Sequence, residues 1–306
     1  MTAAPEHVPV MLNEVFGVLP LSPGSIYLDG TLGLAGHAME AASRITPGGT
    51  LIAFDWDASL LARAEERLSK AEGVRIRLFH SDFRLAPETL GNRLEWPEGS
   101  PKVDGILLDL GVNNAHLELA ERGFSYKAEG PLDMRMDRSQ GETAAAYLNR
   151  APVSDIEKTL WNYGDERWAR RIAQVIVDRR PLKTTQDLVD CVLAAVPPAM
   201  RDKNIHPASR TFQSVRVKIN GELEELEQAL VDLAGFLAVD GVMAVLSYHS
   251  GEDRATKLAF RALSQSGQYC ELYKKPLLPA SAEVDANPKA RSAKLRALRR
   301  IKVEDQ

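Results

Sequence analysis

The sequence predicts an α/β fold, a Rossmann-like sheet with an inserted helical domain. Three observations lead to this prediction. Apolar runs typical of strands alternate with amphipathic helical patterns over about the first 110 residues, as in a parallel sheet with crossover helices. Helical patterns without a convincing strand then follow, and the alternation resumes near residue 222. We therefore expect a sheet domain formed by residues 1–112 and 215–306, with residues 113–214 inserted as a helical domain.

The first part of the chain is predicted to contain four strand and helix units. The predicted strands are Ile26–Leu32, Thr50–Phe54, Val74–Phe79 and Val103–Leu108, with helices over His37–Ile45 and around Leu60–Leu68. The fourth strand is almost wholly apolar, as strands buried on both faces are. A loop rich in glycine, proline and charge, Gly91–Lys102, precedes it.

The remaining elements are expected in two groups. Helices of the insertion are predicted over Ser154–Tyr163, Glu166–Asp178 and Thr185–Ala195. After the insertion we expect a helix Glu222–Leu237, a turn at Asp240–Gly241, a strand Val242–Ser247, a helix Glu252–Leu263 and a closing strand Gln268–Tyr273. The second group would complete the sheet.

Composition excludes several classes of protein. With 306 residues, 44% of them hydrophobic, the chain can bury a sizeable core, and charged residues interrupt both of its longest apolar stretches. No membrane partner is expected. Only Cys191 and Cys270 are present, so neither a disulfide framework nor a metal site is predicted. No basic region followed by an apolar run begins the chain, so a cytoplasmic location is the default expectation.

The net charge of −4 gives no overall attraction to nucleic acid, but the charge is unevenly distributed. Residues 287–302 contain seven lysines and arginines and no acid. We expect Lys289–Lys302 to be a helical run that meets phosphates. In the insertion, arginines 167, 170 and 171 are interleaved with Trp161, Tyr163 and Trp168, a possible RNA surface. For these aromatic residues a place in the core is the favoured interpretation.

A glycine-rich turn and four aspartates mark the expected ligand site. Glycines at 30, 33 and 36 follow the first strand without the spacing of a dinucleotide motif. Asp55 ends the second strand, where a carboxylate can accept both hydroxyls of an adenosine ribose. Asp82 and Phe83 follow the third strand and could contact an adenine, and Asp109 ends the fourth. Together with Asp29, these acids are expected to line one crevice that holds a nucleoside-containing cofactor.

Short motifs along the chain make its relationship recognisable. They are His7–Leu12, Asp29–Gly33, Asp104–Val112, Glu121–Ser125, Gly130–Asp137, Tyr163–Arg167, Arg210–Gln213 and Asn287–Arg296. In sequence and order they resemble the bacterial 16S ribosomal RNA (cytosine-N4)-methyltransferases, the MraW/RsmH family. The resemblance implies a class I S-adenosylmethionine-dependent methyltransferase domain with an inserted helical substrate-recognition domain.

The resemblance also implies a cofactor, a substrate and a set of site residues. The cofactor would be S-adenosyl-L-methionine, and the methyl acceptor a decoding-centre (P-site) cytidine of 16S rRNA within the 30S subunit. The family's cofactor contacts fall on Ala35, Gly36, His37, Asp55, Phe83, Asp109 and His116. Neither DNA nor a membrane is an expected partner, and a homodimer stays open.

The reaction chemistry suggests the catalytic candidates Asp109, Asn113 and Asn114. The exocyclic amine of cytosine is a poor nucleophile, because its lone pair is delocalised into the ring. An acceptor that takes its hydrogen bonds would aim the nitrogen at the methyl group. The aminium formed is acidic and can lose its proton to Asp109 or to water, so no strong base is needed.

Two motifs depart from the family pattern. Residues 111–116 are Gly-Val-Asn-Asn-Ala-His where the family usually has Gly-Val-Ser-Ser-Pro-Gln, and Ser247-Tyr-His-Ser stands where Ser-Phe-His-Ser is usual. The first departure motivates an alternative, an rRNA-binding assembly factor that keeps the fold but has weak or no turnover. A nicotinamide-dependent oxidoreductase is a weaker alternative, against which the glycine spacing argues.

Overall fold

The computed structural model describes residues 9–92, 99 and 101–302, and the chain forms two compact units. The first unit comprises residues 1–111 and 225–306, and the second comprises Val112–Glu224. The expected insertion ended at residue 214, which lies inside helix α10 (Ser209–Asn220). Because a helix is one continuous hydrogen-bonded element, the second unit extends past that position.

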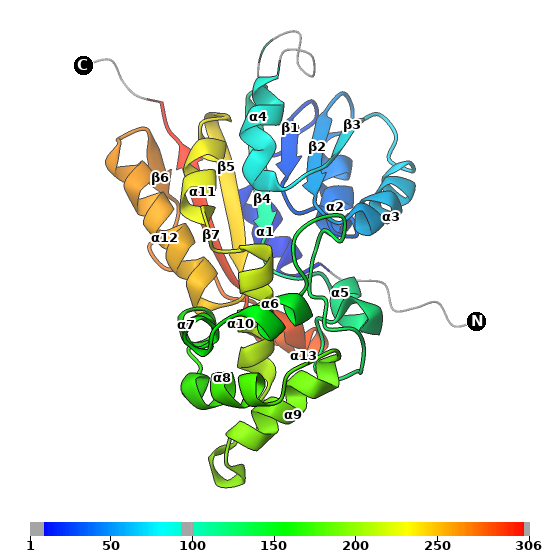
Figure 1. Ribbon diagram of the computed structural model, residues 1–306. Helices are drawn as coiled ribbons and strands as arrows, with labels where there is room; N and C mark the ends of the chain where they lie inside the picture. The colour runs from blue at the N-terminus through cyan, green and yellow to red at the C-terminus, as the bar shows by residue number, and fades with distance from the viewer. Residues whose placement is uncertain (1–8, 93–98, 100, 303–306) are drawn as a thin grey trace. The chain divides into compact units, whose positions relative to one another are not determined.

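The first unit is built on a seven-stranded sheet in the order β3-β2-β1-β4-β5-β7-β6. The strands are β1 (Ile26–Asp29), β2 (Thr50–Asp55), β3 (Arg75–His80), β4 (Val103–Asp109), β5 (Leu237–Ser247), β6 (Tyr269–Glu271) and β7 (Lys294–Arg300). The strands β1 to β5 pair in parallel, whereas β7 runs antiparallel to both β5 and β6. This arrangement confirms the predicted α/β fold, and Figure 1 shows β5 and β7 side by side.

Helices surround the sheet of the first unit and make up most of the second. The first unit contains α1 (Leu12–Val18), α2 (Gly36–Ile45), α3 (Ala58–Leu68), η1 (Phe83–Leu85), α4 (Ala86–Gly91), α11 (Leu226–Ala234), α12 (Ser250–Gln265), α13 (Ser281–Ala286) and η4 (Pro288–Ser292). The second contains α5 (Asn114–Glu118), η2 (Ala120–Arg122), α6 (Ala144–Arg150), α7 (Val153–Gly164), α8 (Ala169–Asp178), α9 (Thr185–Ala195), η3 (Pro198–Met200) and α10. Its described residues form no strand, as predicted, only a single bridge between Pro131 and Thr184.

Apolar side chains cover both faces of the sheet. Val242, Ala244 and Leu246 of β5 belong to a buried cluster with residues of α1 and α2, and Met243 and Val245 between them are equally buried. Since successive residues of a strand point to opposite faces, both faces are packed. Each buried valine or leucine contributes roughly 1.5–3 kcal/mol to folding. This packing explains why the central strands β1, β2 and β4 are largely apolar in the sequence.

The end of the insertion differs from the prediction in one respect. The expected turn at Asp240–Gly241 lies within β5, which begins earlier, at Leu237. These two residues form an irregularity within the strand. Asp240 has a φ of 66°, and the register of β5 against β4 shifts near this point. A Cβ on Gly241 would lie 2.9 Å from the Val103 carbonyl oxygen, so glycine allows the close approach.

The basic C-terminal segment is a strand, so the expectation of a basic helix is wrong. Residues Lys294–Arg300 form β7, inside the sheet. Arg296 is 7% exposed, and its Nε donates to Asp253 Oδ1 at 2.7 Å, while Lys294 Nζ donates to Asp253 Oδ2 at 3.0 Å. The anion that these two cations meet is therefore a carboxylate of α12.

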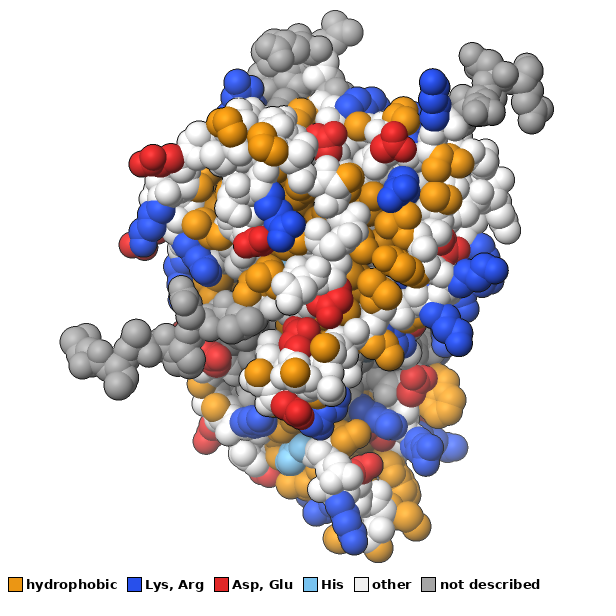
Figure 2. Space-filling model, turned by 180° about the vertical axis from the view of Figure 1, so that it is seen from behind, with side chains coloured by type: hydrophobic (Ala, Val, Ile, Leu, Met, Phe, Trp, Pro, Cys, Tyr) orange, Lys and Arg blue, Asp and Glu red, His pale blue; other side chains and the backbone are white. Residues whose placement is uncertain are grey.

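The surface carries charge of both signs. On the face drawn in Figure 2, the blue and red side chains are scattered among apolar ones. This agrees with the small net charge of the sequence. Among the helices of the described residues, none is long and apolar enough to cross a membrane.

Candidate functional site

Two glycines between β1 and the start of α2 lie in close contact with neighbouring side chains. A Cβ on Gly30 would lie 2.2 Å from Leu108 Cδ2, and one on Gly36 would lie 2.6 Å from Pro9 Cγ. The residue before α2, Ala35, has a φ of 60°. This left-handed conformation costs a residue with a Cβ about 1–2 kcal/mol. The loop is therefore held in one path, with some strain stored at a predicted cofactor contact.

Asp55 ties this loop to the end of β2. Its Oδ2 accepts a hydrogen bond from the Gly33 amide at 2.7 Å, and its Oδ1 accepts one from the Asp57 amide at 2.8 Å. The residue is 7% exposed. A carboxylate bound by two backbone amides has a fixed orientation, which a group that must receive two ribose hydroxyls needs. Its expected contact with a cofactor stays a prediction.

Asp109 ends β4 and meets side chains from three other segments. The Tyr248 hydroxyl donates to its Oδ1 at 2.6 Å, and His37 Nδ1 lies 3.8 Å from its Oδ2. The Asp109 amide donates to Thr31 Oγ1 at 2.6 Å. The Asp109 side chain is 25% exposed. The carboxylate is thus both anchored and accessible.

His37 links this carboxylate to the N-terminal segment. Its Nε2 lies 3.0 Å from the Val10 carbonyl oxygen. Because a carbonyl oxygen only accepts, Nε2 carries the hydrogen of this bond, and the neutral ring then presents Nδ1 as an acceptor.

Asp29 ends β1 and is almost completely enclosed, at 2% exposed. Burial raises its pKa from 3.8 to about 7, and the charges of Asp109 and Asp55 act in the same direction. Hydrogen bonds from the Thr31 amide at 3.1 Å and the Tyr27 hydroxyl at 3.3 Å oppose this shift without cancelling it. The charges of Asp55 and Asp109 thus both act on Asp29, an arrangement that a positively charged ligand would stabilise.

The fourth strand-end acid, Asp82, has a different environment. It caps η1 by accepting from the Arg84 amide at 2.9 Å, and its Oδ2 accepts from Arg84 Nε at 2.8 Å. Phe83 is half-buried and lies against the glycine loop, 3.1 Å from where a Cβ on Gly30 would be. The expectation that the acids line one crevice is wrong for Asp29, which is enclosed. For Asp55, Asp82 and Asp109 it stays a prediction, and Asp82 is paired with Arg84.

The polar residues predicted just after β4 belong to the second unit. Asn114 begins α5, and Asn113 caps this helix, its Oδ1 accepting from the Ala115 amide at 2.9 Å. His116 is 3% exposed, and its ring stacks on Phe124 with 5.1 Å between centroids. Asn113 and His116 thus have local structural contacts, and the expected roles of all three polar residues stay predictions.

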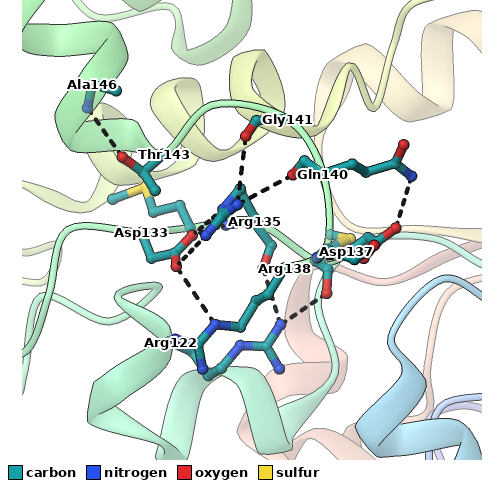
Figure 3. A network of polar contacts seen from close by, with 12 residues as sticks. Arg122, Asp133, Arg135, Asp137, Arg138, Gln140, Gly141, Thr143 and Ala146 are labelled. Atoms are coloured by element: carbon teal, nitrogen blue, oxygen red, sulfur yellow. Dashed lines mark hydrogen bonds and ion pairs between the residues drawn. The ribbon is translucent and has the colours of Figure 1, made fainter.

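Arginines and an aspartate brace the segment between η2 and α6 (Figure 3). Arg122 is 4% exposed, and its Nη2 donates to the carbonyl oxygens of Arg135 and Met136, both at 2.9 Å. Arg135 Nε donates to Asp133 Oδ1 at 2.7 Å, and Arg138 Nε lies 3.6 Å from Asp133 Oδ2. Burial tends to raise the pKa of Asp133, but the hydrogen bonds and charge of Arg135 outweigh it and lower that pKa below 3.8.

A pocket of about 220 Å³ lies within the second unit. Its walls include Arg167, Trp168, Arg201, His206 and Arg210. The expectation that the interleaved aromatic residues are core residues is wrong for Trp161, which is 59% exposed. Cations and aromatic rings together are the side chains that contact phosphates and unstacked bases.

Sequence reasoning missed Tyr248 and Thr31, both of which contact Asp109. Tyr248 directly follows β5, and β5 pairs with β4 in the sheet. The carboxyl ends of neighbouring parallel strands lie at the same edge. The order of the strands was therefore the signal that would have found Tyr248.

Comparisons with known proteins agree over almost the full chain. The profile of the MraW methylase family matches residues 4–301. The "Ribosomal RNA small subunit methyltransferase H" of Geotalea uraniireducens is 42% identical over 313 residues, covering 96% of this chain and 98% of that protein. The protein of the same name from Heliobacterium modesticaldum is 42% identical over 315 residues, covering 97% and 99%.

A solved structure, an rRNA methylase from Streptococcus thermophilus, aligns with 95% of this chain and 92% of that chain. It shares 11% sequence identity with this chain, with a TM-score of 0.40. The sequence matches are of another kind, since they are strong and run nearly from end to end. On their strength, the chain belongs to the MraW methylase family.

Proposed function

We propose that this protein transfers a methyl group from S-adenosyl-L-methionine to N4 of a decoding-centre cytidine in 16S rRNA of the small ribosomal subunit. Family membership and the names of the relatives support the reaction type and the small-subunit RNA. One structural observation carries the proposal furthest. Asp109 is an anchored yet accessible carboxylate at the end of β4, beside two further acids.

The first unit fits a cationic nucleoside cofactor. When bound, S-adenosyl-L-methionine supplies an electrophilic methyl group on a sulfonium. The repulsion that Asp55 and Asp109 exert on Asp29 would be relieved by positive charge. Asp55 would receive the ribose hydroxyls, and Phe83 would flank the base. The remaining proposed contacts within this unit are Ala35, Gly36, His37 and Asp109. The expected contact at His116, which belongs to the second unit, stays a prediction.

Asp109 would act on the methyl acceptor in two ways. Its carboxylate would accept a hydrogen bond from the exocyclic amine, which turns the nitrogen lone pair toward the incoming methyl group. After transfer, the nitrogen carries one proton too many, and Asp109 or water would receive it. Asn113 and Asn114 would assist as further polar groups. Asn113 Oδ1 already accepts from a backbone amide, which favours Asp109 as the principal acceptor.

The second unit is proposed to recognise the RNA. Its pocket combines three arginines with Trp168 and His206, and Trp161 is exposed to solvent. Arginines bind phosphates, and aromatic rings stack on unpaired bases.

The test is methyl transfer to its natural substrate. Labelled S-adenosyl-L-methionine is incubated with 30S subunits from a strain lacking this modification, and the RNA nucleosides are analysed by mass spectrometry. We expect N4-methylcytidine at a single position. Cofactor binding without any methylated cytidine would contradict the proposal and favour an assembly factor without turnover.

A further inference from the structure

We propose that Tyr248 is a positioning residue for Asp109, holding its carboxylate in the orientation that receives the hydrogen of the acceptor amine. The inference rests on the proposed function. It starts from the hydrogen bond between the Tyr248 hydroxyl and Asp109 Oδ1, at 2.6 Å. A bond of this length to a carboxylate is typical of strong, directional hydrogen bonds.

The backbone of Tyr248 is itself fixed. The residue lies between the end of β5 and the start of α12. Its amide donates to Glu252 Oε2 at 2.7 Å, and the His249 amide donates to the same oxygen at 3.3 Å. His249 caps α12 and completes a reciprocal capping box with Glu252. The phenol ring is therefore held from a rigid helix start, as a positioning group requires.

The Tyr248 hydroxyl donates the hydrogen bond and remains protonated. Burial raises the pKa of its hydroxyl well above 10, and the charge of Asp109 and their hydrogen bond act in the same direction. At neutral pH the hydroxyl is therefore always protonated and can orient the carboxylate. The proton released by the methylated amine goes to Asp109 or to solvent, and the phenol takes no part in that transfer.

A second anchor restrains the Asp109 backbone. The Asp109 amide donates to Thr31 Oγ1, and the amide of Thr31 donates to Asp29. These bonds fix where the main chain lies, whereas the hydroxyl of Tyr248 acts on the carboxylate itself. Removal of this hydroxyl should therefore leave the fold intact and loosen the side-chain orientation.

Tyr248→Phe removes the hydroxyl and keeps the ring. Phenylalanine is the residue that the resembled family usually has at this position. A matched control is Tyr269→Phe, whose hydroxyl donates to the Ala234 carbonyl oxygen at 3.1 Å in the same unit. Both variants are assayed for methyl transfer to 30S subunits across the pH range, and S-adenosylhomocysteine affinity is measured by calorimetry. We expect Tyr248→Phe to lower kcat about tenfold with KM and affinity changed less than about twofold.

The pH profile separates positioning from a general structural defect. Without its hydroxyl donor, the ionised carboxylate is less favoured, so the acid limb of kcat should move to higher pH in Tyr248→Phe. Tyr269→Phe should leave the limb where it is. An unchanged acid limb together with unchanged kcat in Tyr248→Phe would overturn the proposal.

A measurement without turnover keeps the two proposals apart. In the unliganded protein, the carboxyl carbon of Asp109 is followed by NMR against pH, with Asp109→Asn to assign its signal. The midpoint should rise by roughly one pH unit in Tyr248→Phe. An unchanged midpoint would overturn the positioning role. Absence of methyl transfer by the unaltered protein would overturn only the proposed function, since the titration reports the pairing in either case.

If Tyr248→Phe does not fold, the same hydrogen-bonded pair is tested by changing Asp109 and following the ionisation of the Tyr248 phenol. Asp109→Asn removes the neighbouring charge that raises the pKa of Tyr248. We expect the phenol to ionise at lower pH in this variant, as followed by ultraviolet absorbance. A phenol that ionises at the same pH in both proteins would contradict the pairing.

Discussion

Each unit of this protein contains a buried aspartate, and the pKa values of the two are shifted in opposite directions. In the first unit, burial and the neighbouring carboxylates raise the pKa of Asp29 to about 7. In the second, burial has the same tendency, but Arg135 overcomes it and lowers the pKa of Asp133. Asp29 is the more deeply buried of the two, and burial is the largest cause of its raised pKa. At Asp133 the hydrogen bonds and the charge of Arg135 outweigh burial, so both the depth of burial and the sign of the neighbouring charge contribute to the difference.

This difference distinguishes a candidate functional site, the acids near Asp109, from a stabilising ion-pair network, the arginines near Asp133. Like charges held close together cost stability, and a bound cation recovers that cost, so such a cluster is typical of functional sites. A carboxylate already matched by arginine needs no ligand. The acids near Asp109 are therefore expected to govern function, and the arginines near Asp133 to govern stability.

The largest expected effect is on methyl transfer by Asp109→Asn. The amide keeps the size of the side chain but removes the negative charge offered to the acceptor amine. We expect single-turnover methylation of 30S subunits to fall at least about 100-fold. Asp253→Asn, which alters a carboxylate engaged by Lys294 and Arg296, is the control and should keep its rate. A rate within about fivefold of the unaltered protein would break the assignment of Asp109.

The next effect is on cofactor affinity in Asp55→Ala. The variant loses both the proposed ribose contact and the bond that holds Gly33. Calorimetry should show S-adenosylhomocysteine bound about 30-fold more weakly, a loss of about 2 kcal/mol. The neighbouring Asp57→Ala removes a helix cap on α3 and should lower stability without changing affinity. Equal affinities for the two variants would show that Asp55 acts only as a structural clamp.

On the stability side, Arg135→Ala should destabilise the protein by about 2 kcal/mol at neutral pH, because it leaves Asp133 buried without this partner. The lowered pKa of Asp133 supplies stability above its ordinary value near 3.8, and this stability is lost as pH falls. Urea unfolding of variant and parent should therefore converge in acid. Arg138→Ala removes a more exposed ion pair, 54% exposed on the arginine side, and should cost under about 0.5 kcal/mol. Equal losses in the two variants would contradict the braced arrangement.

The smallest effect is a pH dependence with the opposite sign, from Asp29. Its raised pKa contributes stability that is fully present below about pH 4 and is lost as pH rises through 7. Asp29→Asn removes this titration. We expect the variant to gain about 1 kcal/mol over the unaltered protein between pH 6 and pH 7, measured by urea unfolding. A gap that stays constant across this range would show that Asp29 does not titrate there.

Local patterns were sufficient for the parallel half of the sheet and insufficient for its antiparallel half. The strands β1, β2 and β4 are largely apolar because both of their faces are packed, and that signal lies in the residues themselves. The edge strand β3, Arg75–His80, has no buried residue and alternates polar with apolar side chains at its start. Lys294–Arg300 is rich in Leu, Ala and Arg, which favour helix. It is a strand because β5 and β6 pair with it and Asp253 receives its cations. Distant partners, not local preference, decide its structure.

The candidate site divides in a similar way. Asp55 and Asp109 were predicted because strand ends are ligand positions in such folds, whatever the rest of the chain does. The enclosure of Asp29 and the pairing of Tyr248 with Asp109 depend on which strands are neighbours. Asp82 follows a strand in the sequence as the other acids do, but in the structure it is paired with Arg84. Residue identity located the acids, but only tertiary contacts distinguished their roles.

The separation of β4 and β5 along the chain has a consequence for biosynthesis. β4 ends at Asp109 and β5 begins at Leu237, with the whole second unit, Val112–Glu224, between them. As the chain emerges from the N-terminus onward, the second unit is complete while the sheet still lacks β5, β7 and β6. Asp109 is therefore synthesised well before Tyr248, whose hydroxyl is proposed to orient it. The acids of the site are thus all synthesised before the second unit, whereas the hydroxyl that orients Asp109 is added only after it.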